Sequence, residues 1–182
     1  HHEHFNETMA CKHGTGLLCG TCHDTHIAGR YPEAAGEGLK AIKKECSSCH
    51  PDHQIYVNGK AKSIDCIDCH MSMASKSAVG KAKGNGWEGD VKTHIFAINT
   101  DAVTKDAMFT QDGAAVVLDN DGLAAVTLDF ACLGCHQSKD VTWASEYAKD
   151  IHDNGIRTIP EYVGSQRCKT CHDNVNANTG YN

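Results

Sequence analysis

The sequence predicts a mainly irregular chain with short α-helices and one small β-hairpin, built around an interior that its own apolar side chains do not fill. Of the 182 residues, 7 are Leu, 10 Ile, 10 Val and 4 Phe. These 31 residues are about 17% of the chain, below the roughly 20% at which a charged chain is suspected of disorder. Cysteine and histidine are abundant instead, with 11 and 13 residues. Such a composition indicates that bound groups supply much of the core.

Five copies of one motif, Cys-x-x-Cys-His, identify those groups. The copies are Cys19-Gly-Thr-Cys22-His23, Cys46-Ser-Ser-Cys49-His50, Cys66-Ile-Asp-Cys69-His70, Cys132-Leu-Gly-Cys135-His136 and Cys168-Lys-Thr-Cys171-His172. This motif is typical of covalent haem c attachment: both thiols bond to the haem vinyl groups and the histidine binds the iron. Two intervening residues let both sulfurs reach one porphyrin edge from a single turn of chain. The sequence therefore predicts five covalently bound haem c groups.

Zinc sites or disulfides are the alternative explanation of paired cysteines. Neither requires a histidine directly after every pair. With 13 His in 182 residues, five such placements by chance have a probability of roughly two in a million. The remaining cysteine, Cys11, is interpreted as a buried thiol or as a cross-link to a partner; ten residues precede it, so a lipid anchor is not expected.

Five haems give one apolar plate per about 36 residues, so the chain without haem is not expected to fold. The formal charge is −6, and five ferric haems with ionised propionates take it to about −11. This acidic balance argues against binding of nucleic acid or anionic membranes. No run of 18 apolar residues is present, which excludes a membrane span by a helix.

The motif positions suggest a single domain over residues 1–182, with haems 1–3 in 19–70, a haem-free segment in 71–131 and haems 4–5 in 132–172. Residues 114–118 and 123–130 are apolar and β-branched, and Asp119-Asn120-Asp121-Gly122 separates them, which predicts a hairpin. Residues 76–89 are rich in Gly, Lys, Ser and Ala and are expected to form an exposed loop.

Two helices are predicted. Residues 33–45 favour a helix that Gly36 and Gly38 weaken. Residues 140–153 carry the better signal, because apolar residues recur at helical spacing and Asn154-Gly155 follows as a stop. A short turn at Pro160 leads to the fifth motif.

Eight histidines outside the motifs are candidate second axial ligands: His1, His2, His4, His13, His26, His53, His94 and His152. Five irons need at most five of them, so two histidines on every haem are possible. Ligation by Met9, Met71, Met73 or Met108 is the alternative, although core filling is the usual role of methionine.

His26 and His53 each follow a proximal histidine by three residues. A residue that close cannot bend round a porphyrin about 10 Å wide to its own haem's far face, because an extended residue spans at most about 3.6 Å. His26 is therefore predicted to bind the iron of the second haem and His53 that of the first, as in a stacked pair. The alternative is that both are surface histidines without a ligand role.

The other three predicted distal ligands are His94, His152 and His13. His94 has apolar neighbours and is assigned to the third or fourth haem, and His152 to any of the last three. His13 is the fifth candidate within the chain. The terminal residues His1, His2 and His4 either fray without a ligand role or cap an exposed haem of a neighbouring molecule.

The extended motifs Cys-x-x-Cys-His-x-x-His at 19–26 and 46–53, with the segment Thr93-His94-Ile95-Phe96-Ala97-Ile98-Asn99, resemble bacterial multihaem c-type cytochromes. Within that group the chain is most similar to the small cytochromes that polymerise into extracellular electron-conducting filaments (cytochrome nanowires) of metal-reducing microbes. The resemblance implies stacked bis-histidine haems, a homo-oligomeric filament and a distal histidine donated between subunits. Redox partner cytochromes or extracellular acceptors would be its partners.

The function expected from these features is electron transfer, with two histidines on each iron holding its potential low. A soluble periplasmic electron shuttle is the alternative. A multihaem reductase of nitrite, hydroxylamine or a sulfur oxyanion would need one open haem. All five motifs end in histidine, so the chain is expected not to be an enzyme and to have no catalytic residue. No signal peptide is visible, and haem is attached to such motifs outside the cytoplasm. A mature product in the extracellular space or at the cell surface is therefore expected, with the periplasm as the alternative.

Overall fold

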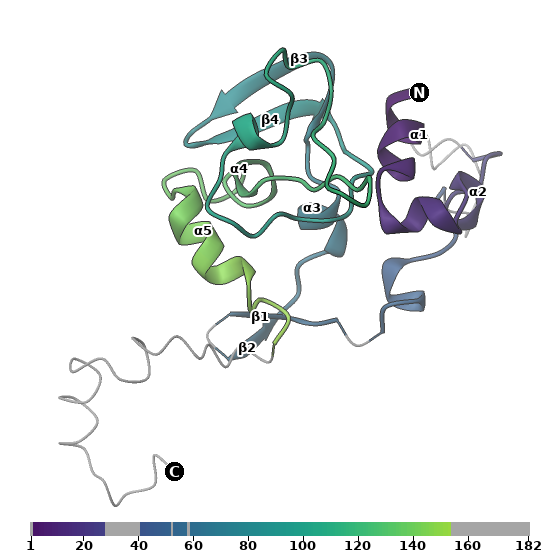
Figure 1. Ribbon diagram of the computed structural model, residues 1–182. Coiled ribbons are helices and arrows are strands. Elements are labelled where there is room, and N and C mark those ends of the chain that lie inside the picture. Colours follow the sequence, from purple (N-terminus) through teal and green to yellow (C-terminus); the bar gives the residue numbers. More distant parts are fainter. Residues whose placement is uncertain (1, 28–40, 52, 58, 154–182) are drawn as a thin grey trace, which may run out of the picture. The chain divides into compact units, whose positions relative to one another are not determined.

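The computed structural model describes residues 2–27, 41–51, 53–57 and 59–153 (Figure 1). The chain divides into two compact units, residues 1–53 with 64–149 and residues 54–63 with 150–182. The fifth motif, the turn predicted at Pro160 and residues 33–40 of the first predicted helix lie outside the described residues. Residues 41–45, the end of that predicted helix, contain no helix.

Helices in the described residues are short. In the first unit they are α1 (His2–Met9), η1 (Lys12–Thr15), α2 (Cys19–Cys22), η3 (Cys46–Ser48), α3 (Cys66–His70), η4 (Lys105–Ala107), α4 (Leu128–Ala131) and α5 (Val141–Ala148). Most have a single turn, which is too short to be stable without tertiary contacts. None is long and apolar enough to cross a membrane. The mainly irregular architecture predicted from the sequence is confirmed.

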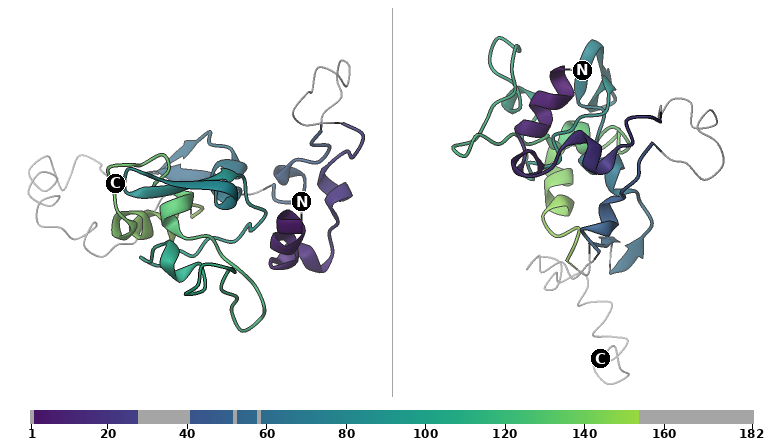
Figure 2. Two further views of the ribbon diagram at one scale, coloured as in Figure 1. Left: turned by 90° about the horizontal axis from the view of Figure 1, so that it is seen from above. Right: turned by 90° about the vertical axis from the view of Figure 1, so that its right-hand side faces the viewer.

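The predicted helix 140–153 is confirmed over its first two turns as α5. Its start is set by Asp140, whose side chain accepts a hydrogen bond from the Trp143 N–H at 2.8 Å and so caps the helix. Residues 149–153 form turns instead of continuing the helix. Within the first unit α4 packs against both α5 and the strand over Gly86–Val91 (Figures 1 and 2).

The main hairpin of the first unit is formed by β3 (Ser75–Lys83) and β4 (Gly86–Val91). The exposed loop predicted over residues 76–89 is therefore wrong. Gly84-Asn85 connects the strands, and Gly84 has a φ of +60°, which glycine adopts without strain. A two-residue loop containing Gly and Asn is a hairpin signal that was present in the sequence.

A second hairpin belongs to the smaller unit. Strand β1 (Ile55–Val57) pairs antiparallel with β2 (Lys60–Lys62), and Asn58-Gly59 separates them in the sequence. Gly59 has a φ of +71°. Asn-Gly is among the most frequent two-residue hairpin sequences, so this element was also readable from the chain.

The hairpin predicted over residues 114–130 is not formed. Its turn is real: Gly122 has a φ of +76° and its N–H donates to the Asp119 carbonyl at 3.0 Å. The following residues bond elsewhere, because the N–H of Ala124 donates to Ala10 at 2.8 Å and that of Val126 to Ala97 at 2.9 Å. Distant segments therefore replace residues 114–118 as partners, and α4 begins at Leu128.

Two small clusters form the core of the first unit. Ile95, Val126, Ala124 and Met108 are buried in one, and Leu128 with Leu133 in the other. Val126 and Leu128 are fully buried. The buried members of both clusters lie in residues 74–144, and the second cluster joins α4 to α5. The segments that carry the first three motifs contribute little to this core.

Asp129 is a buried carboxylate that connects α4 to the segment at Lys105 by hydrogen bonds. It accepts hydrogen bonds from the Thr127 hydroxyl at 2.6 Å and from the Lys105 N–H at 2.7 Å. We expect Asp129→Ala to lower the free energy of unfolding by about 2–3 kcal/mol, because a buried hydroxyl and a partly buried N–H lose a charged acceptor. Chemical denaturation of the haem-loaded protein measures this. Asp121→Asn, on an exposed turn, is the control; equal losses in both variants would contradict the assignment.

Candidate haem sites

Each described motif closes one turn of chain. The histidine N–H donates to the carbonyl of the first cysteine, at 2.9 Å from His23 to Cys19, 2.9 Å from His50 to Cys46 and 3.0 Å from His136 to Cys132. The third motif forms α3 itself. Both sulfurs and the imidazole therefore project from a single turn, the arrangement that covalent haem attachment requires.

Exposed apolar side chains flank the first three motifs. Leu18 precedes Cys19 and is 79% exposed, and Ile64 and Ile67 stand on either side of Cys66. Ile42, also exposed, forms a β-bridge with His23. Apolar side chains gathered beside the attachment cysteines fit a large apolar ligand such as a porphyrin. The described residues thus fit the group that the motifs predict.

The motifs lie near one another along the first unit. Burial, followed by interaction with Cys66, raises the pKa of the Cys46 thiol, to which Cys22 also contributes. Burial likewise raises the pKa of Cys69, with a contribution from Cys135. Each effect links thiols of different motifs. Cys46 therefore lies near Cys22 and Cys66, and Cys69 lies near Cys135.

Cys132 is the most strongly affected thiol. Burial raises its pKa to about 12, with smaller contributions from Cys69 and Cys135. Deprotonating this thiol is costly because a thiolate there would lie in an apolar environment. A thioether carries no such charge, so haem attachment suits the burial of this sulfur.

Two proximal histidines lie opposite a histidine from elsewhere in the chain. The ring centroids of His23 and His94 are 6.2 Å apart, and those of His13 and His50 are 6.0 Å apart. Imidazoles on opposite faces of one metal ion have centroids about 6.3 Å apart, given metal–nitrogen bonds of about 2.0–2.1 Å. Both pairs therefore have the spacing of axial ligands that share one iron.

Two further histidines are held by hydrogen bonds from Nδ1. His70 donates to the Phe96 carbonyl at 2.7 Å, and His152, in the smaller unit, donates to the Gln54 carbonyl at 2.8 Å. A hydrogen bond of this kind fixes the tautomer that presents Nε2 to a metal and makes the ring a stronger ligand. Both histidines thus have the environment of metal-ligating imidazoles.

Phe96 connects three of these sites. Its carbonyl holds His70, its ring lies 4.7 Å from the ring of His13, and His94 stands two residues before it. The segment 94–96 therefore contacts the first, second and third sites. His94 was a candidate ligand from the sequence, whereas nothing in the motif spacing indicated a role for Phe96.

The other candidate ligands have different neighbours from the pairs His23–His94 and His13–His50. The side chain of His26 is 93% exposed, and its ring is beside Asp24 at 3.3 Å. The ring of His53 is 5.7 Å from that of His50, three residues away in the chain. The ring beside His136 belongs to Trp143, at 4.8 Å. Met108 is buried in the core, and Met9 is exposed.

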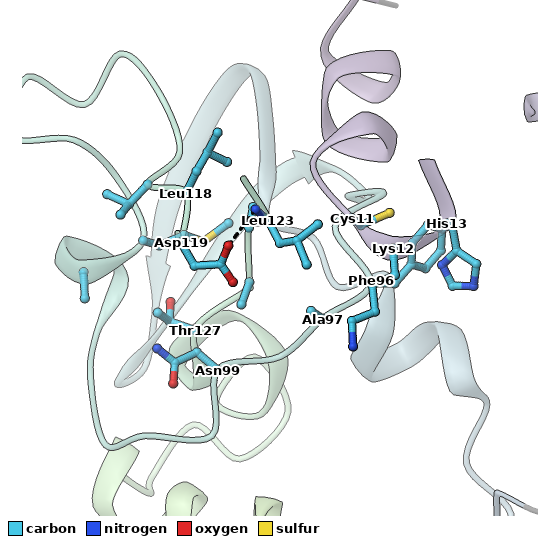
Figure 3. Close-up of a pocket in the computed structure, with 15 residues that line it drawn as sticks. Cys11, Lys12, His13, Phe96, Ala97, Asn99, Leu118, Asp119, Leu123 and Thr127 are labelled. Carbon is cyan, nitrogen blue, oxygen red and sulfur yellow. Dashed lines mark hydrogen bonds between the residues drawn. The ribbon is translucent and has the colours of Figure 1, made fainter. Parts of the chain in front are cut away.

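A cavity of about 590 Å³ opens beside His13. Residues 11–13 form one side of it, and Phe96, Leu118 and Leu123 line it elsewhere (Figure 3). Asp119 points toward Leu123, whose N–H it binds at 2.8 Å. Cys11 is buried here, and its thiol donates to the Thr8 carbonyl at 2.9 Å.

Comparison with known proteins gives one solved structure. No protein-family model matches the chain, and no curated protein matches it. The chain is similar to the octaheme sulfite reductase MccA of Wolinella succinogenes (form II), with a TM-score of 0.51 and 22% sequence identity. The match covers 81% of this chain and 29% of that protein.

This similarity corrects one prediction. The chain was expected not to be an enzyme because all five motifs end in histidine, but the similar structure is that of a reductase. The prediction that the chain is not an enzyme is therefore withdrawn. At 22% identity the similarity is one of fold. Together with the Cys-x-x-Cys-His turns, it shows that the chain has the fold of a multihaem c-type cytochrome.

Proposed function

We propose that the chain is a pentahaem c-type cytochrome that transfers electrons along a series of neighbouring haems. His94 is the second axial ligand of the first haem, and His13 that of the second. The observation that carries this proposal is the pair of opposed imidazoles, at 6.2 and 6.0 Å. Bound haem supplies a one-electron ferric/ferrous couple.

The protein's own residues keep these couples suited to electron transfer. Imidazoles on both faces of an iron exclude water and substrate, so no ligand has to leave when the charge changes. Two histidines also keep the potential low compared with His/Met ligation. At the third site the Phe96 carbonyl strengthens His70 as a donor, which lowers the potential there further.

Distal ligands for the other three haems are proposed from the remaining histidines. His152 is the best supported, because its Nδ1 is already bound to the Gln54 carbonyl. His26 and His53 stay predictions from the motif spacing.

Five attached haems and bis-histidine coordination are tested together on the purified protein. Intact-mass spectrometry is expected to give the polypeptide mass plus five haems. Near-infrared magnetic circular dichroism of the oxidised protein is expected to show low-spin bis-histidine bands. A Cys46→Ser, Cys49→Ser variant should carry one haem fewer. Fewer than five haems in the unaltered protein would contradict the proposed count.

Reduction of a small substrate at the fourth haem is a second candidate function. The ring beside His136 is that of Trp143, and a solved structure of similar fold is a sulfite reductase. This candidate requires an open fourth iron, in which case the dithionite-reduced protein would take up one equivalent of carbon monoxide at neutral pH. Absence of carbon monoxide uptake would contradict this candidate, and electron transfer would then be the single proposed function.

Assembly and location are proposed from the resemblance to filament cytochromes. The chain would act outside the cytoplasm, at the cell surface or in the periplasm, and would pass electrons to redox partners there. Polymerisation into a filament is tested by negative-stain microscopy of concentrated protein. Isolated particles of single-chain size at every concentration would contradict the filament and favour a soluble shuttle.

A further inference from the structure

Three side chains outside the haem motifs gather at one point of the first unit. The potential ligand atoms of His4, Glu7 and His94 all lie within 4.8 Å of one another, and each residue is partly buried. We propose that these residues form a second metal site, which binds a divalent ion of the zinc and copper class. It lies beside the first haem and shares His94 with it.

Two of the ligands come from one face of α1. His4 and Glu7 are three residues apart on this helix, so their side chains are neighbours on its surface. His94 comes from the segment that follows β4, 87 residues from Glu7. A sequence separation of this size explains why spacing along the chain did not reveal the site.

The carboxylate of Glu7 is held in position by two donors. The hydroxyl of Ser75 donates to one oxygen, and the His94 N–H donates to the other at 2.9 Å. Outer partners of this kind orient ligating carboxylates and leave further lone pairs for a metal ion. Glu7 therefore links α1, β3 and the His94 segment at the proposed site.

The spacing of the two imidazoles is that of neighbouring ligands on one ion. The ring centroids of His4 and His94 are 4.5 Å apart, with 39° between the ring planes. Ligands at angles of about 90–109° on one metal have centroids about 4.4–5.1 Å apart, given bonds of about 2.0–2.1 Å. The 6.2 Å between His94 and His23 belongs instead to ligands on opposite faces.

His94 has a ring nitrogen for each site. Its Nδ1 is buried and has no hydrogen-bond partner among the described residues. A buried ring nitrogen without a partner is unusual, because such groups are normally satisfied. With one nitrogen on the haem iron and the other on the second ion, the ring is a bridging ligand. Its N–H proton is then released to solvent as the ion binds.

The donor set selects the class of ion. Two imidazoles and one carboxylate match the three-ligand sites of Zn²⁺, which keep a fourth position open. Calcium and magnesium prefer oxygen ligands only, and Cu(I) prefers sulfur. The site therefore favours Zn²⁺ or Cu²⁺ over these alternatives.

Calorimetric titration of the oxidised, haem-loaded protein with Zn²⁺ tests the site. The unaltered protein is expected to bind one equivalent and release one proton, measured in buffers of different ionisation enthalpy. His4→Gln should weaken binding at least 10-fold. His2→Gln, two residues away on α1, is the matched control and should bind Zn²⁺ as the unaltered protein does.

Haem content is measured as well, so that a loss of Zn²⁺ affinity can be distinguished from a loss of haem. The haem content and visible spectrum of His4→Gln should equal those of the unaltered protein, so loss of Zn²⁺ affinity with five intact haems supports the site. Cu²⁺ is expected to broaden the electron paramagnetic resonance signal of one low-spin haem in the unaltered protein only. Equal Zn²⁺ affinity in His4→Gln and the unaltered protein would overturn the proposal. An equal loss in His2→Gln would also overturn it, because that result means adventitious binding by the histidine-rich terminus.

Discussion

Replacing His94 by glycine is expected to convert one low-spin haem into one that binds carbon monoxide. His94 lies 6.2 Å from His23, ring centroid to ring centroid, so its removal leaves one face of the first iron without a protein ligand. Carbon monoxide uptake by the reduced variant should exceed that of the unaltered protein by one equivalent. The potential of one haem should rise, because a strong donor is lost. Added imidazole should reverse both changes.

A second pair of variants tests whether His13 or His26 is the second ligand of the second haem. Spacing predicts that His26 serves the second haem, whereas the structure places His13 opposite His50 and leaves the His26 side chain 93% exposed. His13→Gly is therefore expected to open one haem, and His26→Gly none. Carbon monoxide binding by His26→Gly but not by His13→Gly would contradict the pairing seen in the structure.

Preventing haem attachment is expected to abolish the fold. Protein made without haem-attachment machinery should give the far-ultraviolet circular dichroism of an unfolded chain and no cooperative thermal transition. The reason is the small core: the buried clusters lie in residues 74–144 and include several alanines. Ordering each residue costs about 1–2 kcal/mol of backbone entropy, and this core buries too little apolar surface to offset that.

Removing one haem shows which part of the fold depends on it. The Cys46→Ser, Cys49→Ser variant should keep the main hairpin and α5, which pack against α4, and lose protection around His13 and residues 41–51. Hydrogen exchange followed by mass spectrometry measures this region by region. A haem-free chain that unfolds cooperatively would contradict the dependence on haem.

Local signals explain which elements could be predicted. Helix α5 combines an Asp140 cap with apolar residues at helical spacing, and its start was predicted correctly. Gly84-Asn85 and Asn58-Gly59 are equally local signals, from which both hairpins were predictable. The apolar residues near 114–118 and 123–130 were misleading, because β-propensity reports a preference for a paired surface and not the identity of the partner. Ala124 and Val126 bond to Ala10 and Ala97, which no local pattern reveals.

The mainly irregular fold predicted from the sequence is confirmed, and the attachment cysteines and proximal histidines are predictions that need only residues adjacent in the chain. A single turn brings each cysteine pair and its histidine together whatever the rest of the molecule does. The proposed second ligands are different, because an imidazole on the far face of an iron would have to come from a distant segment. Only the tertiary structure places His94 against His23, His13 against His50, and His4 and Glu7 beside His94. These contacts arise from long-range packing, which the spacing of histidines along the chain does not encode.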